Sequence, residues 1–144
     1  MKPKGVWLAV TVPDVVPLRL SAGGRIYLKS TLQFHYADHP DYPGERKVVT
    51  DEYAHTLSRD ELLAEEILSW HWQPGSRVDP HLHVGPVPGG PPKRRHIPSG
   101  RIAFEQVLKY AIEEEDVRPC LAKAAALARI NESLRRFEVF RTWE

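Results

Sequence analysis

The sequence predicts a single α+β domain, with an antiparallel sheet of about five strands followed by two C-terminal helices packed on one face. Several segments within residues 1–84 alternate apolar and polar residues, which is typical of strands. Residues 102–115 and 119–137 instead repeat their apolar side chains at helical spacing. Between them, residues 85–101 form a basic stretch rich in proline and glycine, which indicates a loop.

The size and charge of the chain limit what it can be. A length of 144 residues suits one domain, and 42% hydrophobic against 27% charged residues excludes general disorder. Twenty basic and nineteen acidic residues leave a net charge of +1, so no overall field attracts nucleic acid or an anionic membrane. Phosphate binding would therefore require a local cluster of basic residues.

Compartment and redox chemistry follow from the cysteine count and the N-terminus. Cys120 is the only cysteine, which excludes an internal disulfide framework and a cysteine-rich zinc site. The N-terminal apolar run ends at Pro13, too early for a membrane span, and it lacks the cleavage site of a signal peptide. We therefore expect a cytoplasmic protein with no membrane partner.

The strands are predicted in chain order. Residues 6–12 alternate as a first strand, and residues 16–20 either continue it or pair with it. The clearest alternation follows a glycine turn and places one set of residues inward (Ile26, Leu28, Leu32, Phe34 and Tyr36) and the other outward (Tyr27, Lys29, Thr31, Gln33 and His35). Residues 47–57 form a further strand, whereas residues 58–64 are compatible with a helical turn.

A hairpin is predicted over residues 67–84, with a turn at residues 74–79. Leu68, Trp70 and Trp72 point inward on its first strand, and Leu82 and Val84 do so on its second. His71, His81 and His83 then lie on the opposite face, in a register that brings His71 close to His81 or His83. Tyr53 and His55 share a face of the preceding strand, and we expect them to join this group. Three to four histidines thus converge on the face away from the helices.

The two C-terminal helices are predicted from their apolar stripes. The second begins near Pro119, a residue suited to the first helical position, and carries Cys120 on its apolar side. We therefore expect Cys120 in the core. The same alanine-rich stripe would also fit the interface of a homodimer.

The first functional hypothesis is cleavage of RNA without a metal or other cofactor. Imidazoles titrate near neutral pH, so His81, His83 and His71 could exchange protons with the 2′-hydroxyl and the leaving oxygen. Arg101 would stabilise the charge on the phosphorane. We expect the substrate-binding residues to be Arg94, Arg95, His96 and Tyr53, with Tyr53 stacking a base.

Two other hypotheses use the same residues. His81, His83 and His96 provide three nitrogen ligands for a divalent metal such as zinc or manganese, which would make the protein a metal-dependent hydrolase or nuclease. Alternatively the histidines are ordinary surface residues, and the protein is a module that binds a protein or nucleic acid without chemistry.

Three short motifs carry a resemblance: Trp70-His71-Trp72, Pro80-His81-Leu82-His83, and His96-Ile97-Pro98-Ser99-Gly100-Arg101 leading into a helix. They resemble an uncharacterised family of small bacterial proteins. The order of strands, His-x-His strand and C-terminal helix is also similar to TumE-type toxins of toxin–antitoxin pairs, over about the central two-thirds of the chain. The resemblance implies RNA cleavage involving His81 and His83 and restraint by an antitoxin protein. The proline-rich insertion at residues 86–92 and the alanine-rich second helix depart from that pattern.

Overall fold

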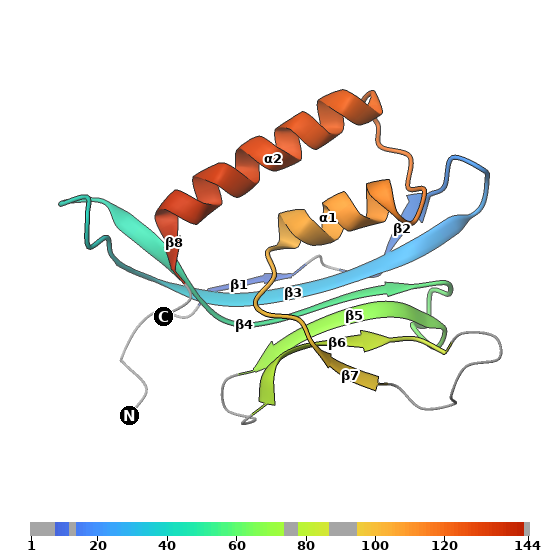
Figure 1. The fold of residues 1–144 in the computed structure, drawn as a ribbon, viewed down its shortest axis with the longest axis horizontal. Coiled ribbons are helices and arrows are strands. Elements are labelled where there is room, and N and C mark those ends of the chain that lie inside the picture. The colour runs from blue at the N-terminus through green and yellow to red at the C-terminus, as the bar shows by residue number, and fades with distance from the viewer. Residues whose placement is uncertain (1–7, 12–13, 74–77, 87–94, 143–144) are drawn as a thin grey trace.

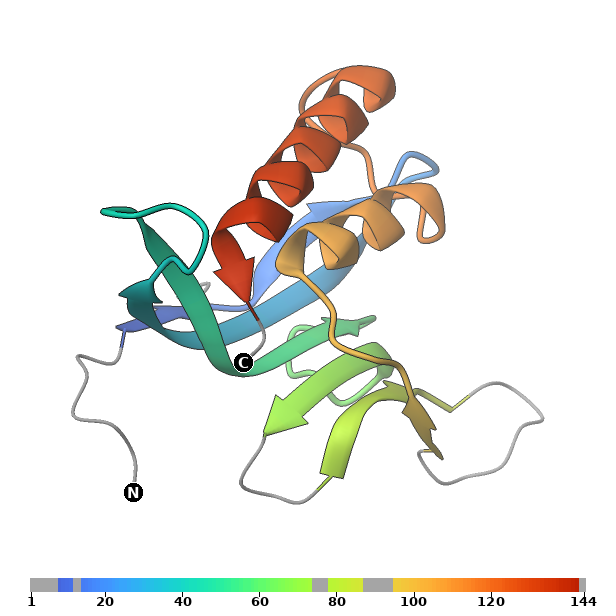
Figure 2. The ribbon, with the colours of Figure 1, turned by 60° about the vertical axis from the view of Figure 1, so that its left-hand side comes forward.

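The computed structural model describes residues 8–11, 14–73, 78–86 and 95–142. They form one sheet and two helices, and both helices lie on the same side of the sheet (Figures 1 and 2). The strands are β1 (Leu8–Thr11), β2 (Val16–Arg19), β3 (Arg25–Asp38), β4 (Arg46–Ser58), β5 (Glu66–Gln73), β6 (Val78–Val84), β7 (Arg95–Pro98) and β8 (Arg141–Thr142), and the helices are α1 (Phe104–Glu113) and α2 (Lys123–Phe140).

The predicted α+β class is confirmed, with a slightly larger sheet than expected. The main path of six strands runs β1-β3-β4-β5-β6-β7, and every neighbouring pair along it is antiparallel. Two short strands lie off this path: β2 pairs with β3 beside β1, and β8 pairs with β4 in the parallel direction. The small strand β8 follows α2, so the helices are not the last elements of the chain.

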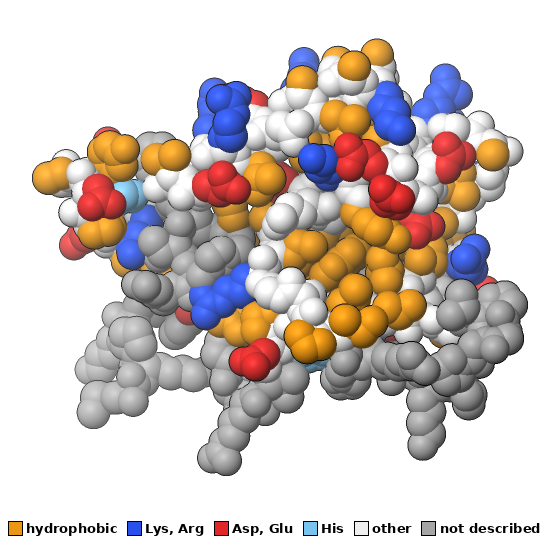
Figure 3. Space-filling view, in the orientation of Figure 1, with side chains coloured by type: hydrophobic (Ala, Val, Ile, Leu, Met, Phe, Trp, Pro, Cys, Tyr) orange, Lys and Arg blue, Asp and Glu red, His pale blue; other side chains and the backbone are white. Residues whose placement is uncertain are grey.

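The core lies between the sheet and the helices. Alternating residues of β3, β4 and β5 face α1, which buries its own apolar side against them. The core includes Ile26, Leu28, Tyr53, Leu57, Leu68, Trp70, Trp72, Val107, Ala111 and Ile112. Hydrophobic side chains are visible between the helices and the strands below them, while charged side chains follow the helices (Figure 3). The predicted inward positions of Leu68, Trp70 and Trp72 are confirmed, with exposures of 8%, 5% and 7%.

The prediction of a loop over residues 85–101 is wrong for residues 95–98, which form a strand. Arg95–Pro98 forms β7, which pairs antiparallel with β6 and covers its outer edge. A sheet edge presents unpaired N–H and C=O groups, so pairing favours a strand here even beside prolines. Residues 87–94 of the predicted loop lie outside the described residues.

The segment that could have been a helical turn, residues 58–64, contains bends and turns instead. The carboxylate of Asp60 accepts hydrogen bonds from the backbone N–H groups of Ala64 and Glu65, at 3.1 and 2.6 Å. These bonds close a tight local loop that leads directly into β5, which leaves no room for a continuing helix.

The second helix begins at Lys123 and not near Pro119. Before it, Val117 bridges to Leu20 and the N–H of Arg118 donates to the carbonyl of Arg19, at 2.8 Å. This pairing holds the chain extended along the end of β2, so the helix starts later than its pattern predicts. Cys120 therefore lies before the helix and is exposed, which corrects its predicted place in the core. Neither helix in the described part of the chain is both long and apolar enough to cross a bilayer.

Candidate functional site

Three histidines meet on the outer face of the sheet, the face turned away from α1 and α2. His71 of β5 is paired with His81 of β6, and Ser69 is paired with His83. The ring of His71 lies 5.9 Å from that of His81 and 4.8 Å from that of His83, centroid to centroid. The rings of His81 and His83 are 4.9 Å apart. The predicted convergence of His71, His81 and His83 is thus confirmed.

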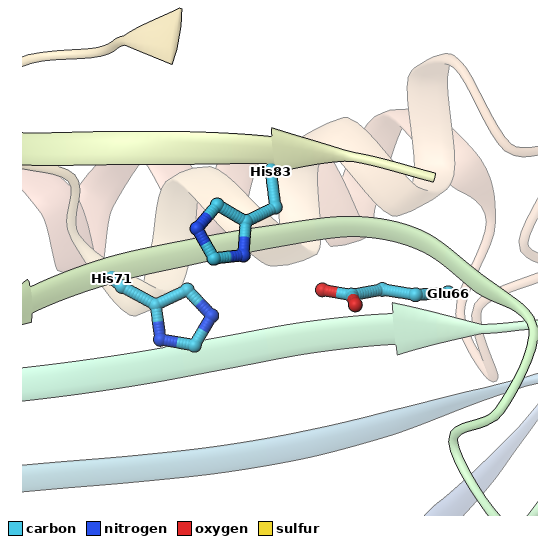
Figure 4. A group of neighbouring side chains, drawn as sticks. All are labelled: Glu66, His71 and His83. Carbon is cyan, nitrogen blue, oxygen red and sulfur yellow. The ribbon is translucent and has the colours of Figure 1, made fainter. Parts of the chain in front are cut away.

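A carboxylate that the sequence analysis missed joins them. The potential ligand atoms of Glu66, His71 and His83 all lie within 4.8 Å of one another. Figure 4 shows both imidazole rings and the carboxylate turned toward a common centre, from β5 and β6. Glu66 is only 7% exposed, whereas the two histidines are half-buried. We call Glu66, His71, His81 and His83 the outer-face cluster.

Glu66 reaches this face because β5 contains a bulge. Leu57 pairs with Leu68, but the next residue of β4, Ser58, pairs with Glu66, so Ile67 has no direct partner on β4. One extra residue reverses the alternation, and the side chain of Glu66 shares a face with Ser69 and His71 instead of with Leu68. The backbone N–H of Gly85 donates to the carbonyl of Ile67 at 2.9 Å. This hydrogen bond holds the end of β6 against the bulge.

Hydrogen bonds orient two of the imidazoles. The hydroxyl of Ser69 lies 2.5 Å from Nε2 of His71 and 2.7 Å from the hydroxyl of Thr56, which forms a short polar chain across β4 and β5. Nδ1 of His81 lies 2.9 Å from the carbonyl oxygen of Asp79. A carbonyl only accepts, so His81 donates from Nδ1, and its neutral ring carries the lone pair on Nε2.

Tyr53 and His55 were predicted to join the histidines, and this prediction is wrong. They pair with Trp72 and Trp70, so their side chains belong to the core face, where they are 2% and 0% exposed. The Tyr53 hydroxyl accepts a hydrogen bond from the N–H of Ile102 at 3.0 Å, and Nδ1 of His55 lies 2.7 Å from the hydroxyl of Ser30. The Tyr53 hydroxyl and Nδ1 of His55 thus each have a hydrogen-bond partner inside the core, and the burial of Tyr53 means that its ring cannot stack a base.

The predicted arginines also lie elsewhere. The guanidinium of Arg101 stacks 4.2 Å from the ring centroid of Trp72, a residue of the core face, so Arg101 is not placed to act on a group bound at the outer-face cluster. Arg94 lies outside the described residues. In β7, Arg95 is paired with Val84 and His96 with His83, so of these predicted residues only His96 occupies a ladder position next to the cluster.

The cluster supports two kinds of chemistry. Two imidazoles and a carboxylate are the donors that first-row divalent metals prefer, and histidine pairs can also transfer protons without a metal. The third imidazole, His81, lies close to both rings and could transfer protons with or without a metal. Comparison with known proteins does not decide between them, since no protein-family model, curated protein or solved structure matches this chain.

Proposed function

We propose that this protein is a metal-dependent phosphodiester hydrolase whose divalent ion is held by Glu66, His71 and His83. The observation that carries the proposal is the mutual approach of their ligand atoms, all within 4.8 Å. In a tetrahedral zinc site the ligand atoms are separated by roughly 3.3 Å, as the metal–ligand distances require. Small side-chain rotations would close the group around an ion and leave one position open for water or substrate.

The surroundings fit this assignment. The hydroxyl of Ser69 lies 2.5 Å from Nε2 of His71 and orients this ring, and an ion bound at Nε2 would take the place of that hydrogen bond. Glu66 is nearly buried, and a buried carboxylate is stabilised by a positive charge beside it. Imidazole ligands suit zinc and iron, among other metals, and a carboxylate ligand also suits manganese.

The reaction would be hydrolysis. A water oxygen attacks phosphorus, the bond from phosphorus to the leaving oxygen breaks, and the products are a phosphomonoester and an alcohol. A bound divalent ion would polarise the phosphate and make the water more acidic. His81 accepts the proton of the water at Nε2 and returns it to the leaving oxygen, because its Nδ1 is committed to the Asp79 carbonyl.

Metal-free RNA cleavage by the same imidazoles is the second candidate, favoured by the contacts among the rings of His71, His81 and His83. That mechanism needs a fixed cation at the phosphorane. The predicted cation, Arg101, lies over Trp72 instead. A metal ion supplies the missing positive charge, which is why we rank the metal-dependent reaction first.

Metal binding and hydrolysis can be tested together. Chelator-treated protein would be titrated with Zn²⁺ and Mn²⁺ by calorimetry, and its cleavage of an end-labelled RNA and of bis(p-nitrophenyl) phosphate followed with and without metal. We expect one ion per chain, and activity only with the ion. Glu66→Gln and His83→Ala should weaken binding by more than about 100-fold, beyond the loss typical of second-shell changes.

His35→Ala is the matched control, because His35 pairs with Asp51 and lies outside the cluster. It should bind metal as the parent does. Absence of metal binding by the parent protein would overturn the proposal. RNA cleavage that persists in chelator and disappears in His83→Ala would establish the metal-free mechanism instead. Absence of cleavage by the parent protein, with or without metal, would favour a binding module.

A further inference from the structure

Beside the cluster, the outer face carries basic residues on either side of an aromatic ring. Ile26, Leu28 and Ser30 of β3 are buried against the core, so Arg25, Tyr27 and Lys29 face outward. In β2, Arg19 is paired with Arg25 and adds a third cation. Arg19 and Arg25 are exposed, while Tyr27 and Lys29 are half-buried. We call Arg19, Arg25, Tyr27 and Lys29 the basic track.

The ladder connects this track to the cluster. Lys29 is paired with Thr56, Thr56 with Ser69, and Ser69 with His83, so the four residues form one row across β3, β4, β5 and β6. Three strand spacings of about 4.8 Å place the backbone of Lys29 roughly 14 Å from that of His83. A chain lying along this row would reach the track and the cluster at once, over the small hydroxyl side chains of Thr56 and Ser69.

We propose that the basic track binds single-stranded nucleic acid and delivers its phosphodiesters to the outer-face cluster, an inference that rests on the proposed function. The charge of the track complements a phosphate backbone, and none of its three cations forms an ion pair with a described residue. Tyr27 lies between Arg25 and Lys29 on the same strand, where an unpaired base could stack on its ring while the neighbouring cations bind phosphates.

The arrangement favours a single strand over a duplex. Stacking on Tyr27 requires the face of an unpaired base, which a duplex keeps inside its own stack. The overall charge of +1 gives no general attraction to polyanions, so binding must be local to this face. Along β4 the carboxylate nearest in sequence to Thr56 is Glu52, which is paired with Gln33, four residues along β3 from Lys29. Glu66 of the cluster lies two strands from Tyr27, in the row that passes through Ser58.

The test is fluorescence anisotropy of a labelled unstructured oligonucleotide, RNA and DNA in parallel, with the full chain in excess chelator so that no metal chemistry occurs. We expect Tyr27→Ala to weaken binding roughly tenfold, within the range for loss of one stacked base. Arg25→Gln with Lys29→Gln should reduce the salt dependence of log K by about 1.4, which corresponds to two phosphate contacts on a single strand.

A charge-matched control removes two cations from the helix side, Lys109→Gln with Arg129→Gln. This control should bind as the parent does, and thermal melting followed by circular dichroism would confirm that each variant is folded. Equal weakening in both double variants, or no binding by the parent, would overturn the assignment of the track. Tighter binding of RNA than of DNA would identify a contact to the 2′-hydroxyl, whereas equal binding would indicate recognition of backbone and bases alone.

The outcome is separable from that of the proposed function. If the track binds oligonucleotide, His83→Ala should retain this binding in chelator, and Tyr27→Ala should retain metal binding and hydrolysis of bis(p-nitrophenyl) phosphate. If the parent protein hydrolyses that small ester but binds no oligonucleotide, the basic track is rejected and the proposed hydrolase activity is supported. If the parent protein binds oligonucleotide but no metal, and Tyr27→Ala loses the oligonucleotide binding, the basic track is supported and the hydrolase is rejected.

Discussion

Gly85 and Glu66 are packed so closely that a Cβ on residue 85 would lie 1.6 Å from the carbonyl oxygen of Glu66. Any side chain at this position must therefore displace backbone, since a carbonyl cannot rotate away as a flexible side chain would. The contact lies at the bulge around Ile67, which turns the carboxylate of Glu66 toward His71 and His83. The absence of a side chain at Gly85 thus permits the close backbone approach beside the bulge that orients a candidate metal ligand.

The first prediction concerns Gly85→Ala. We expect a loss of about 1–3 kcal/mol in the free energy of unfolding, as in other overpacked sites, together with weaker Zn²⁺ binding because the bulge must move. Urea denaturation and calorimetric titration would measure the two effects. Gly23→Ala is the control: it has open space around it but a φ of +97°, so it should cost stability through its backbone alone and leave metal binding intact. Normal metal affinity in Gly85→Ala would contradict the argument.

Strand alternation was enough to predict the histidine part of the site. Leu68, Trp70 and Trp72 define the inward face of β5 so clearly that His71 had to point the other way, and Leu82 and Val84 did the same for His81 and His83. Glu66 was missed because strict alternation assigns it to the face of Leu68. Only the bulge reverses that assignment, and a glycine after the His-x-His strand was the one available signal of close backbone approach.

The remaining errors arise where tertiary contacts override local pattern. The polar side chains on both faces of their strand suggested that Tyr53 and His55 lie at the surface, yet both are buried and form hydrogen bonds inside the core. Arg101 was expected to bind phosphate because it lies near the histidines in sequence. Its guanidinium instead stacks on the ring of Trp72, which lies on the opposite face of the sheet from the histidines. These contact partners are distant in sequence or lie on the opposite face of the sheet, so the spacing of residues within one strand cannot predict them.

The second prediction is that Tyr53→Phe destabilises the protein without changing the site. The Tyr53 hydroxyl accepts the N–H of Ile102 at 3.0 Å, where the chain leaves β7 and enters α1. Removing the hydroxyl leaves that N–H without this acceptor, which typically costs about 1–3 kcal/mol. Denaturant unfolding would show the loss, and metal titration of the same variant should match the parent. A weakened metal affinity would mean that Tyr53 does contribute to the outer face.

The third prediction concerns Cys120, which the structure places outside the core. We expect its thiol to react with Ellman's reagent in the native protein at a rate close to that in denaturant, because nothing needs to unfold first. The released thionitrobenzoate, followed by absorbance, gives both the rate and the stoichiometry. Protection that disappears only on adding denaturant would show that the segment before α2 is buried after all.

The fourth prediction is a pH dependence from Asp60. The backbone N–H of Glu65, and after it the hydroxyl of Ser58 and the N–H of Ala64, lower the pKa of this carboxyl against the opposing effect of desolvation. A lowered pKa in the folded state means that the ionised form stabilises the loop between β4 and β5 above the ordinary aspartate range, and that this contribution is lost as the pH falls through the folded pKa.

Asp60→Asn should therefore reduce the free energy of unfolding near neutral pH, and its difference from the parent should shrink in acid. Urea denaturation at neutral pH and at a pH well below the ordinary aspartate range would measure both differences. A difference that is the same at both pH values would show that the loss comes from packing or geometry and not from the charge of Asp60.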